Sequence, residues 1–206
     1  MTRENLIPRH IRSKRRTTIS ATDVTFPSDL LVRDFSAPAP GAKLVGDITY
    51  MRTTSGWLYL ATVIDCCCKE VVGWAIQPHM KAPLVVEALE MASRRVRITP
   101  GETVFHSDRG SQYLSGKFQR ALTQLNIRQS VGRTGTALDN ALAESFFGFL
   151  KSECLYRYPI ADQHRTRAQV VAYIEDFYNT ERLHSSLNYR SPNQVHEEYL
   201  KTKEVA

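Results

Sequence analysis

The chain has 206 residues, of which 42% are hydrophobic, and this is enough for one sizeable domain with appendages. Its net charge of +6 favours a polyanionic partner such as nucleic acid, although a basic protein of another kind fits the composition equally well. The sequence has no run of about eighteen apolar residues and no secretory signal, so we expect no membrane partner and a cytoplasmic location.

The four cysteines include three adjacent ones, Cys66, Cys67 and Cys68. Adjacent cysteines do not match the spaced patterns of zinc sites, and they make a poor disulfide framework. We therefore expect reduced thiols.

The first 42 residues differ in composition from the rest, and we expect them to form a basic arm and linker, residues 1–42. Six Lys or Arg residues and one acid fall between Met1 and Arg16, and the stretch ends in the Pro-rich segment Ser36–Gly41. Such an arm can follow a DNA backbone, or it can be a solvated terminus. The sequence leaves both open.

From Lys43 onward the patterning is that of a folded core, expected at residues 43–160. Three stretches rich in β-branched and aromatic residues predict an antiparallel meander: Lys43–Met51, Trp57–Asp65 and Val71–Gln77. Helices and short strands then alternate: Pro83–Arg97, Thr103–His106, Gly116–Leu125, Ile127–Gln129 and Leu138–Glu153. A further helix, Arg167–Thr180, is expected in a C-terminal helical extension of the core, residues 161–206. This order predicts an α/β fold, a mixed sheet with helices on its faces.

Three acidic residues occupy positions at which such a fold places catalytic groups. Asp47 lies inside an otherwise apolar strand, where a carboxylate is costly unless it is paired or binds a cation. Asp108 follows a short strand, and Glu144 lies on the helix at Leu138–Glu153. Each also has a plain structural explanation: a paired acid for Asp47, a turn cap for Asp108 and a solvated helix face for Glu144.

The motifs GDITY, HSDRGSQY and DNALAESFFGFLKSE, in this order, resemble bacterial insertion-sequence transposases with a retroviral-integrase-type core. Asp108 and Glu144 are separated by 35 residues, the spacing that defines this class, and the tail from Phe177 to Pro192 resembles the family's C-terminal segment. The resemblance implies a ribonuclease H-like fold with a five-stranded mixed sheet flanked by helices. It also implies a polynucleotidyl transferase that cleaves and joins DNA strands in transposition.

The resemblance further implies that Asp47, Asp108 and Glu144 are catalytic and bind metal, with Asp47 bridging two ions and the others flanking. Phosphodiester cleavage concentrates negative charge, and two Mg²⁺ ions about 3.5–4 Å apart can activate the attacking oxygen and stabilise the leaving one. Mg²⁺, or Mn²⁺ in its place, prefers hard oxygen ligands and keeps several waters, so a few carboxylates suffice. We expect water, and then a DNA 3′-hydroxyl, to be the nucleophile.

Four further residues are expected to contact DNA: Lys151, Asn140, His106 and Arg109. Lys151 comes seven residues after Glu144, about two helical turns on, and would direct its ammonium group along bound DNA. Asn140 could position substrate or cap its helix together with Asp139. His106 could contact phosphate or make a local hydrogen bond.

For the remaining polar and aromatic residues we expect mostly structural roles. Asp65 is interpreted as a turn residue at the end of its strand. The basic tail, Arg182, His184 and Arg190, touches DNA or only covers the surface. Four residues on the Glu144 helix are expected in the core: Phe146, Phe147, Phe149 and Leu150.

The implied partner is double-stranded DNA, at transposon ends and at the target, with the chain acting as a homo-oligomer bound to the nucleoid. Transposases of this group usually carry a helix-turn-helix region upstream, and residues 1–42 leave little room for one, so a separate helix-turn-helix protein could supply it. Two further positions depart from the family's pattern. Cys66–Glu70 replaces a turn that usually contains Ser or Arg, and Leu183 stands where the family usually has Pro. Two alternatives stay open: a nuclease on the same fold, and an inactive, DNA-binding-only transposon remnant.

Overall fold

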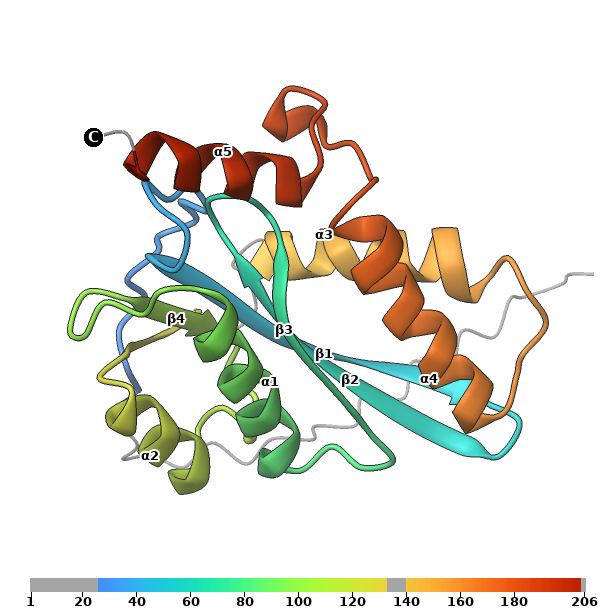
Figure 1. The fold of residues 1–206 in the computed structure, drawn as a ribbon. Coiled ribbons are helices and arrows are strands. Elements are labelled where there is room, and N and C mark those ends of the chain that lie inside the picture. The colour runs from blue at the N-terminus through green and yellow to red at the C-terminus, as the bar shows by residue number, and fades with distance from the viewer. Residues whose placement is uncertain (1–25, 133–139, 205–206) are drawn as a thin grey trace, which may run out of the picture.

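A single mixed sheet with helices on both faces forms the centre of the molecule (Figure 1). The structure, a computed structural model, describes residues 26–132 and 140–204. The strand order is β3-β2-β1-β4-β5, which confirms the expected five-stranded mixed sheet. The strands are β1 (Lys43–Thr53), β2 (Gly56–Asp65), β3 (Val71–Gln77), β4 (Val104–Ser107) and β5 (Arg128–Val131).

The pairing of the central strand determines where a crevice can open. β1 pairs antiparallel with β2 along its whole length, and β2 pairs antiparallel with β3. On its other side β1 pairs in parallel with β4, but only through Lys43–Val45, and β4 pairs in parallel with β5. The two parallel strands therefore part just before Asp47. Ligand sites of α/β sheets commonly lie at such carboxyl ends.

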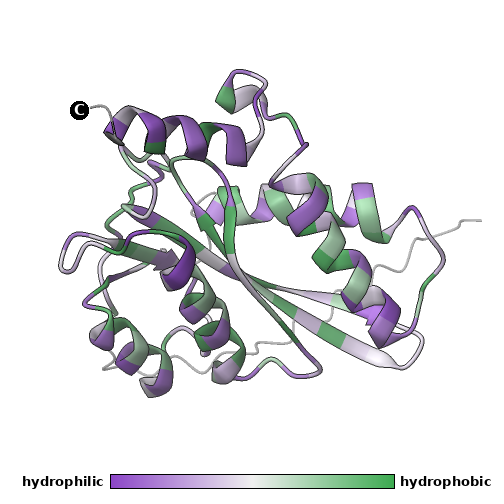
Figure 2. Ribbon diagram, in the orientation of Figure 1, coloured by the Kyte–Doolittle hydropathy of each residue, from purple (hydrophilic) through white to green (hydrophobic). Residues whose placement is uncertain are grey.

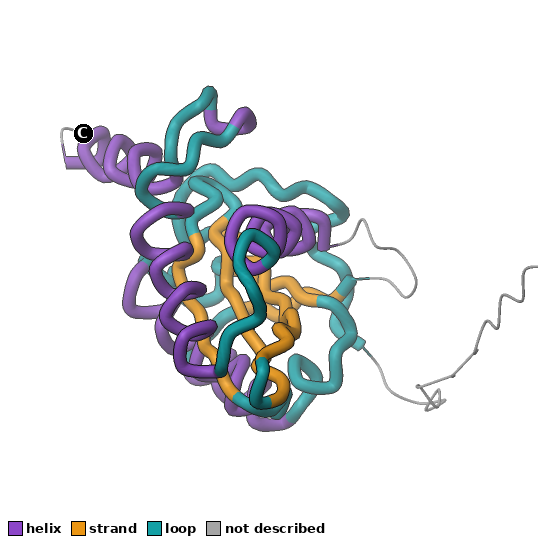
Figure 3. Tube along the Cα trace, turned by 90° about the vertical axis from the view of Figure 1, so that its right-hand side faces the viewer, coloured by secondary structure: helices purple, strands orange, loops and turns teal. Residues whose placement is uncertain are grey.

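Helices cover the two faces of the sheet separately. α1 (Ala82–Arg95) and α2 (Gly116–Gln124) lie on one face, and α3 (Ala141–Phe149) and α4 (Gln163–Ala172) on the other. Both α3 and α4 continue directly as π-helical turns, η2 (Leu150–Leu155) and η3 (Tyr173–Tyr178). A 3₁₀ turn, η4 (Ser185–Leu187), and α5 (Pro192–Glu204) end the described chain. In the turned view of Figure 3 the strands lie between the helices.

The apolar residues form two cores, one for each face of the sheet (Figure 2). The α1–α2 side includes Leu44, Phe105 and Phe118, and the α3–α4 side includes Val45, Phe146 and Ile174. Close packing of α1 on β3 depends on Gly73, because a Cβ there would lie 2.2 Å from the Ala88 carbonyl oxygen.

Most expected elements are present, and their ends differ from the predicted ones. The first two residues of the predicted helix Leu138–Glu153 lie outside the described residues, and its last turns are π-helical. The helix expected at Arg167–Thr180 begins four residues earlier, at Gln163, where the Asp162 carboxylate accepts a capping bond from the Arg165 N–H. α5 was not predicted, because its sequence is mostly polar.

The described part of the N-terminal stretch packs on the core. Leu31 is 3% exposed and belongs to the α3–α4 core, and the Leu30 N–H donates to Ser130 Oγ over 2.8 Å. The basic residues between Met1 and Arg16 lie outside the described residues. Within the described ranges, no helix is long and apolar enough to cross a membrane.

Candidate active site

Asp47 stands on the central strand at the point where β1 and β4 part. Side chains alternate along a strand, and Val45 and Met51 belong to the α3–α4 core, so Asp47 faces the same side as α3. Its neighbour Gly46 faces the other way, where a Cβ would lie 2.3 Å from the Phe105 ring. The Asp47 carboxylate is half-buried and accepts a 2.7 Å bond from the Ile48 N–H.

The other two acids come from the segments that flank this point. Asp108 directly follows β4, is exposed, and accepts a 2.9 Å bond from the Gly110 N–H. The turn contact considered from the sequence is therefore present, and it leaves the second carboxylate oxygen available. Glu144 lies in the first turn of α3 and is exposed.

Asn140 precedes α3 and is buried, 7% exposed. Its side chain makes no capping bond, so the structure does not support the helix-cap explanation. Neither amide atom has a hydrogen-bond partner among the described residues. The amide lies close enough to Asp47 to lower its pKa, in a geometry that falls short of a hydrogen bond. A buried amide without a partner beside a carboxylate is poised for a ligand.

The electrostatics of Asp47 link the three acids. The pKa of Asp47 is raised to about 7: burial is the largest cause, the negative charges of Asp108 and Glu144 add to it, and the Ile48 N–H and Asn140 oppose it. The structure thus brings together three acids that are separated by up to 97 positions in the sequence, since 144 − 47 = 97.

Tyr113 adds a polar group that the sequence did not single out. Its side chain is 2% exposed and packs between Phe105 and Phe118. Its hydroxyl has no hydrogen-bond partner among the described residues. Burial, with the charges of Asp47 and Asp108, raises the pKa of this hydroxyl well above its usual value, so it stays protonated as a donor. Its place as the last residue of HSDRGSQY was the available signal.

This donor set fits a hard divalent cation. Three carboxylates repel one another when all are ionised, and the raised pKa of Asp47 measures part of that cost. A cation would remove the repulsion and give the unpartnered Asn140 amide a charged or hydrated neighbour.

His106 and Arg109, the two expected DNA contacts near Asp108, have different environments in the structure. His106 is 1% exposed, lies 2.8 Å from Ser130 Oγ through Nδ1 and packs edge-on against Phe35. This favours the local hydrogen bond over a phosphate contact, because the 26–42 segment covers the ring. Arg109 is exposed, donates to the Gly132 carbonyl and stacks on Phe26 with 4.6 Å to the ring centroid.

Lys151 borders a cavity of about 500 Å³ between the β1–β2 hairpin and the segment after η2. Its ammonium group lies over the Tyr50 ring, 5.5 Å from the centroid, and Tyr50 packs edge-on against Trp57. The lining is unusual in its exposed aromatic side chains: Tyr50, Trp57, Tyr156 and Tyr158. We call this cavity the aromatic groove. Sequence reasoning missed it, because exposed aromatic residues carry no periodic signal.

Asp65 and Arg182 both make contacts within the molecule that give them a structural role. Asp65 is fully buried and accepts bonds from the N–H groups of Gly41, Cys67 and Cys68, as expected of a turn residue. Arg182 pairs with Glu153 at 2.8 Å and stacks on Phe149.

The rest of the basic tail is also engaged within the molecule. His184 is 8% exposed, and burial lowers its pKa to about 4. Arg190 pairs with Glu198 and donates to the Leu187 carbonyl. These intramolecular contacts give each residue of the tail a structural role.

Comparison with known proteins gives a consistent result. Residues 37–137 match the family described as "Integrase core domain", and residues 125–192 match a second family of the same description. The chain is 44% identical to the transposase InsF for insertion sequence IS3fB of Escherichia coli K12 over 172 residues, which cover 84% of this chain and 59% of that relative. It is 37% identical to the transposase for insertion sequence element IS904 of Lactococcus lactis over 164 residues, covering 80% and 64%. The chain therefore spans about 60% of the length of these relatives.

Solved structures agree on the fold. A chain of the simian T-cell lymphotropic virus intasome in complex with PP2A regulatory subunit B56 gamma superposes with a TM-score of 0.66 at 20% identity, covering 78% of this chain and 56% of that one. The HTLV-2 integrase catalytic core domain in complex with magnesium gives 0.58 at 17% identity, covering 77% and 98%. These neighbours confirm the ribonuclease H-like fold. The protein thus belongs to the integrase core family, and it is similar to insertion-sequence transposases.

Proposed function

We propose that this chain is the catalytic core of a transposase that cuts and joins DNA strands with bound Mg²⁺ or Mn²⁺. The observation that carries the proposal is the convergence of Asp47, Asp108 and Glu144: burial is the main cause that raises the pKa of Asp47 to about 7, and the charges of Asp108 and Glu144 contribute to the rise. Like-charged groups gathered at a strand end cost stability, and such a cost is typical of functional sites. The reaction class would be polynucleotidyl transfer.

In this proposal each side chain has a separate task. Asp47, Asp108 and Glu144 would hold two ions, which would stabilise the charge that develops on the phosphate oxygens. The free amide of Asn140 lies close enough to Asp47 to lower its pKa, and the protonated Tyr113 hydroxyl is close enough to feel the charges of Asp47 and Asp108. The rigid sheet and α3 keep these groups in place without substrate, so that little reorganisation is needed when DNA binds.

The proposed DNA path runs from the acids along η2 into the aromatic groove. Lys151 supplies a positive charge at its border, and Arg52 lines it as well. Lys and Arg bind phosphates, and exposed aromatic rings stack on unpaired bases. The partners would be duplex DNA at transposon ends and at the target, with several copies of the chain and a helix-turn-helix protein assembled on the nucleoid.

One experiment tests the proposal against its two alternatives. The chain is incubated with Mg²⁺ and labelled transposon-end duplexes, with target plasmid, and the products are separated on denaturing gels. Nicked and joined products are expected, and both should vanish in Asp47→Asn but persist in Asp176→Asn, which alters an exposed acid on η3. Nicks without joining would identify a nuclease, and DNA binding without products would identify an inactive remnant.

A further inference from the structure

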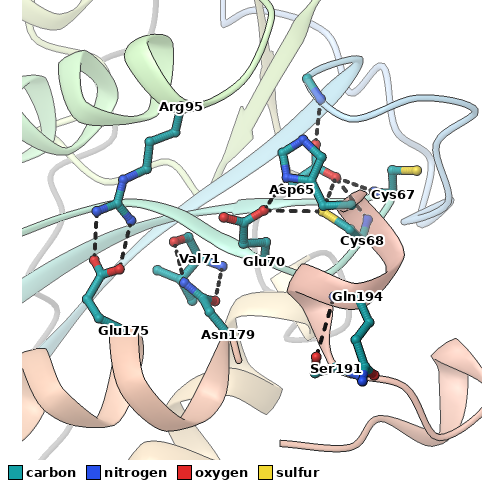
Figure 4. Close-up of polar contacts among 12 residues, drawn as sticks. Asp65, Cys67, Cys68, Glu70, Val71, Arg95, Glu175, Asn179, Ser191 and Gln194 are labelled. Atoms are coloured by element: carbon teal, nitrogen blue, oxygen red, sulfur yellow. Dashed lines mark hydrogen bonds and ion pairs between the residues drawn. The ribbon is translucent and has the colours of Figure 1, made fainter. Parts of the chain in front are cut away.

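A second group of ionisable side chains lies away from the three acids, where the β2–β3 turn meets α5. Cys68 Sγ is 3.8 Å from Glu70 Oε2, and His196 Nδ1 is 2.6 Å from the same oxygen. The ligand atoms of Cys68, Glu70 and His196 all lie within 4.8 Å of one another. Figure 4 shows the Cys68 sulfur directed at Glu70, with Asp65 beside it, and the Cys67 sulfur directed away.

The distances suit a small tetrahedral metal ion. Zinc, with bonds of about 2.3 Å to sulfur and about 2.0–2.2 Å to nitrogen and oxygen, places its ligand atoms roughly 3.3–3.7 Å apart. The Cys68–Glu70 separation of 3.8 Å and the Cys68 Sγ to Asp65 Oδ1 separation of 3.3 Å are already close to this range. The 2.6 Å hydrogen bond between His196 Nδ1 and Glu70 Oε2 would have to open by about 0.7 Å to reach roughly 3.3 Å.

The burial and charge of the two carboxylates give a second, independent reason to expect a metal ion at this point. Asp65 is fully buried and Glu70 is 9% exposed. Among the described residues, neither carboxylate is paired with a Lys or Arg side chain: Asp65 accepts from backbone N–H groups and the Cys68 thiol, and Glu70 contacts only Cys68 and His196 through its side chain. Two buried carboxylates thus face one imidazole. A divalent cation would balance them with the thiolate.

The position in the fold suggests what such an ion does. No described residue of α5 belongs to either hydrophobic core. α5 makes polar contacts with the rest of the molecule, such as the Asn193 N–H to the Asn179 carbonyl at 2.9 Å. His196 reaches from α5 to a residue that lies 126 positions earlier, so an ion at this point would fasten the last helix to the sheet.

We propose that Cys68, Glu70 and His196 form a structural site for Zn²⁺ or a similar borderline metal, with Asp65 Oδ1 as the nearest oxygen for the fourth position. A sulfur and an imidazole among the ligands select such metals, whereas the all-oxygen set at Asp47 selects Mg²⁺. Binding releases the proton of the Cys68 thiol and displaces the proton that His196 Nδ1 shares with Glu70 Oε2, which moves to Nε2 of a neutral imidazole or, from an imidazolium, to solvent. Zn²⁺ then takes up one thiolate, one carboxylate and one neutral nitrogen.

Cobalt spectroscopy on the full chain tests the ligands directly. Co²⁺ added to the reduced protein should give a thiolate-to-cobalt charge-transfer band of one sulfur, which one equivalent of Zn²⁺ abolishes and excess Mg²⁺ leaves unchanged. The band should be lost in Cys68→Ser, and His196→Asn should weaken the apparent affinity at least about tenfold. Cys67→Ser and Cys154→Ser, which alter sulfurs outside the group, should retain it.

Thermal unfolding measures zinc binding without relying on the cobalt absorption band. Free Zn²⁺ at about a hundred times its Kd should raise the Tm of the wild type by roughly 5–10 °C, and that of Cys68→Ser by much less. The absence of the band in the folded wild type, or its persistence in folded Cys68→Ser, would overturn the proposal and leave a hydrogen-bond network alone. Asp47→Asn should keep the band, so failure of the proposed DNA chemistry is distinguishable from failure of this site.

Discussion

Replacing Asp47 by Asn should stabilise the metal-free protein, and the gain should depend on pH. Burial, with the charges of Asp108 and Glu144, raises the pKa of Asp47 from 3.8 to about 7 in the folded chain. At about 1.4 kcal/mol for each pH unit between these values, ionised Asp47 costs the folded state up to about 4 kcal/mol. This is an upper limit, because the side chain is half-buried and the three acids adjust their charges together.

The sign follows from the direction of the pKa change. Below about pH 4 the carboxyl is neutral in the folded and the unfolded chain, so it costs nothing there. Between about pH 4 and 7 it ionises only on unfolding, and stability is lost progressively; above about pH 7 the full cost is present. The amide of the Asp47→Asn variant carries no charge at any of these pH values. The stability gain of the variant should therefore grow from about pH 4 to 7 and then level off.

Urea unfolding in a chelator at several pH values measures this gain. Asp176→Asn is the matched control, since Asp176 is exposed on η3 and should give no comparable dependence. Mg²⁺ should then stabilise the wild type and leave Asp47→Asn almost unaffected, because one ligand is gone. A gain that does not change with pH, or a variant less stable than the wild type above about pH 7, would refute the reasoning.

Three further predictions concern activity and DNA binding. Asp108→Asn and Glu144→Gln should each abolish strand cleavage with an unchanged circular dichroism spectrum, since each loses a charged ligand without changing shape; near-normal cleavage would remove that residue from the site. Mg²⁺ or Mn²⁺ should support turnover and Ca²⁺ only binding, because Ca²⁺ is larger and less strict in geometry, whereas full activity in a chelator would contradict a metal mechanism. Duplex binding should weaken steeply with salt, and Lys151→Ala should lower the slope of log K against log salt by about one for all sequences alike. A preference above roughly a hundredfold for a transposon end over a scrambled duplex, about 2.7 kcal/mol, would instead show that the chain reads sequence.

The strands and the acids were predictable because their signals are local. β1, β2 and β3 agree with the predicted stretches to within about two residues, since β-branched and aromatic runs bounded by turns have few other solutions. The spacing of Asp108 and Glu144 indicated a shared site through resemblance. What the sequence could not supply was a sign of physical proximity, which the effect of the Asp108 and Glu144 charges on the pKa of Asp47 provides.

The features that sequence reasoning missed depend on tertiary contact. The π-helical turns η2 and η3 differ from α-helix by one residue per turn, which a pattern of apolar residues over six positions does not resolve. Tyr113 was not singled out, and Asn140 was expected to contact DNA but not to be buried; neither side chain has a hydrogen-bond partner among the described residues, and such burial leaves no trace in sequence. The group at Cys68 joins segments 126 positions apart, so the three adjacent cysteines suggested no metal ligand.

The three acids stay together because the elements that carry them are anchored on their other faces. Asp47 is held by β2 along the whole strand, and Gly46 lets the Phe105 ring pack beneath it. Glu144 is exposed, but Ala143, Phe146 and Phe147 on the same helix are buried in the core. Apolar burial of about 1.5–3 kcal/mol for each large side chain is enough to offset a carboxylate repulsion of a few kcal/mol. The sheet and α3 can therefore hold a charge arrangement that is unfavourable until a cation arrives, which is why neutralising Asp47 should increase stability where neutralising a surface acid does not.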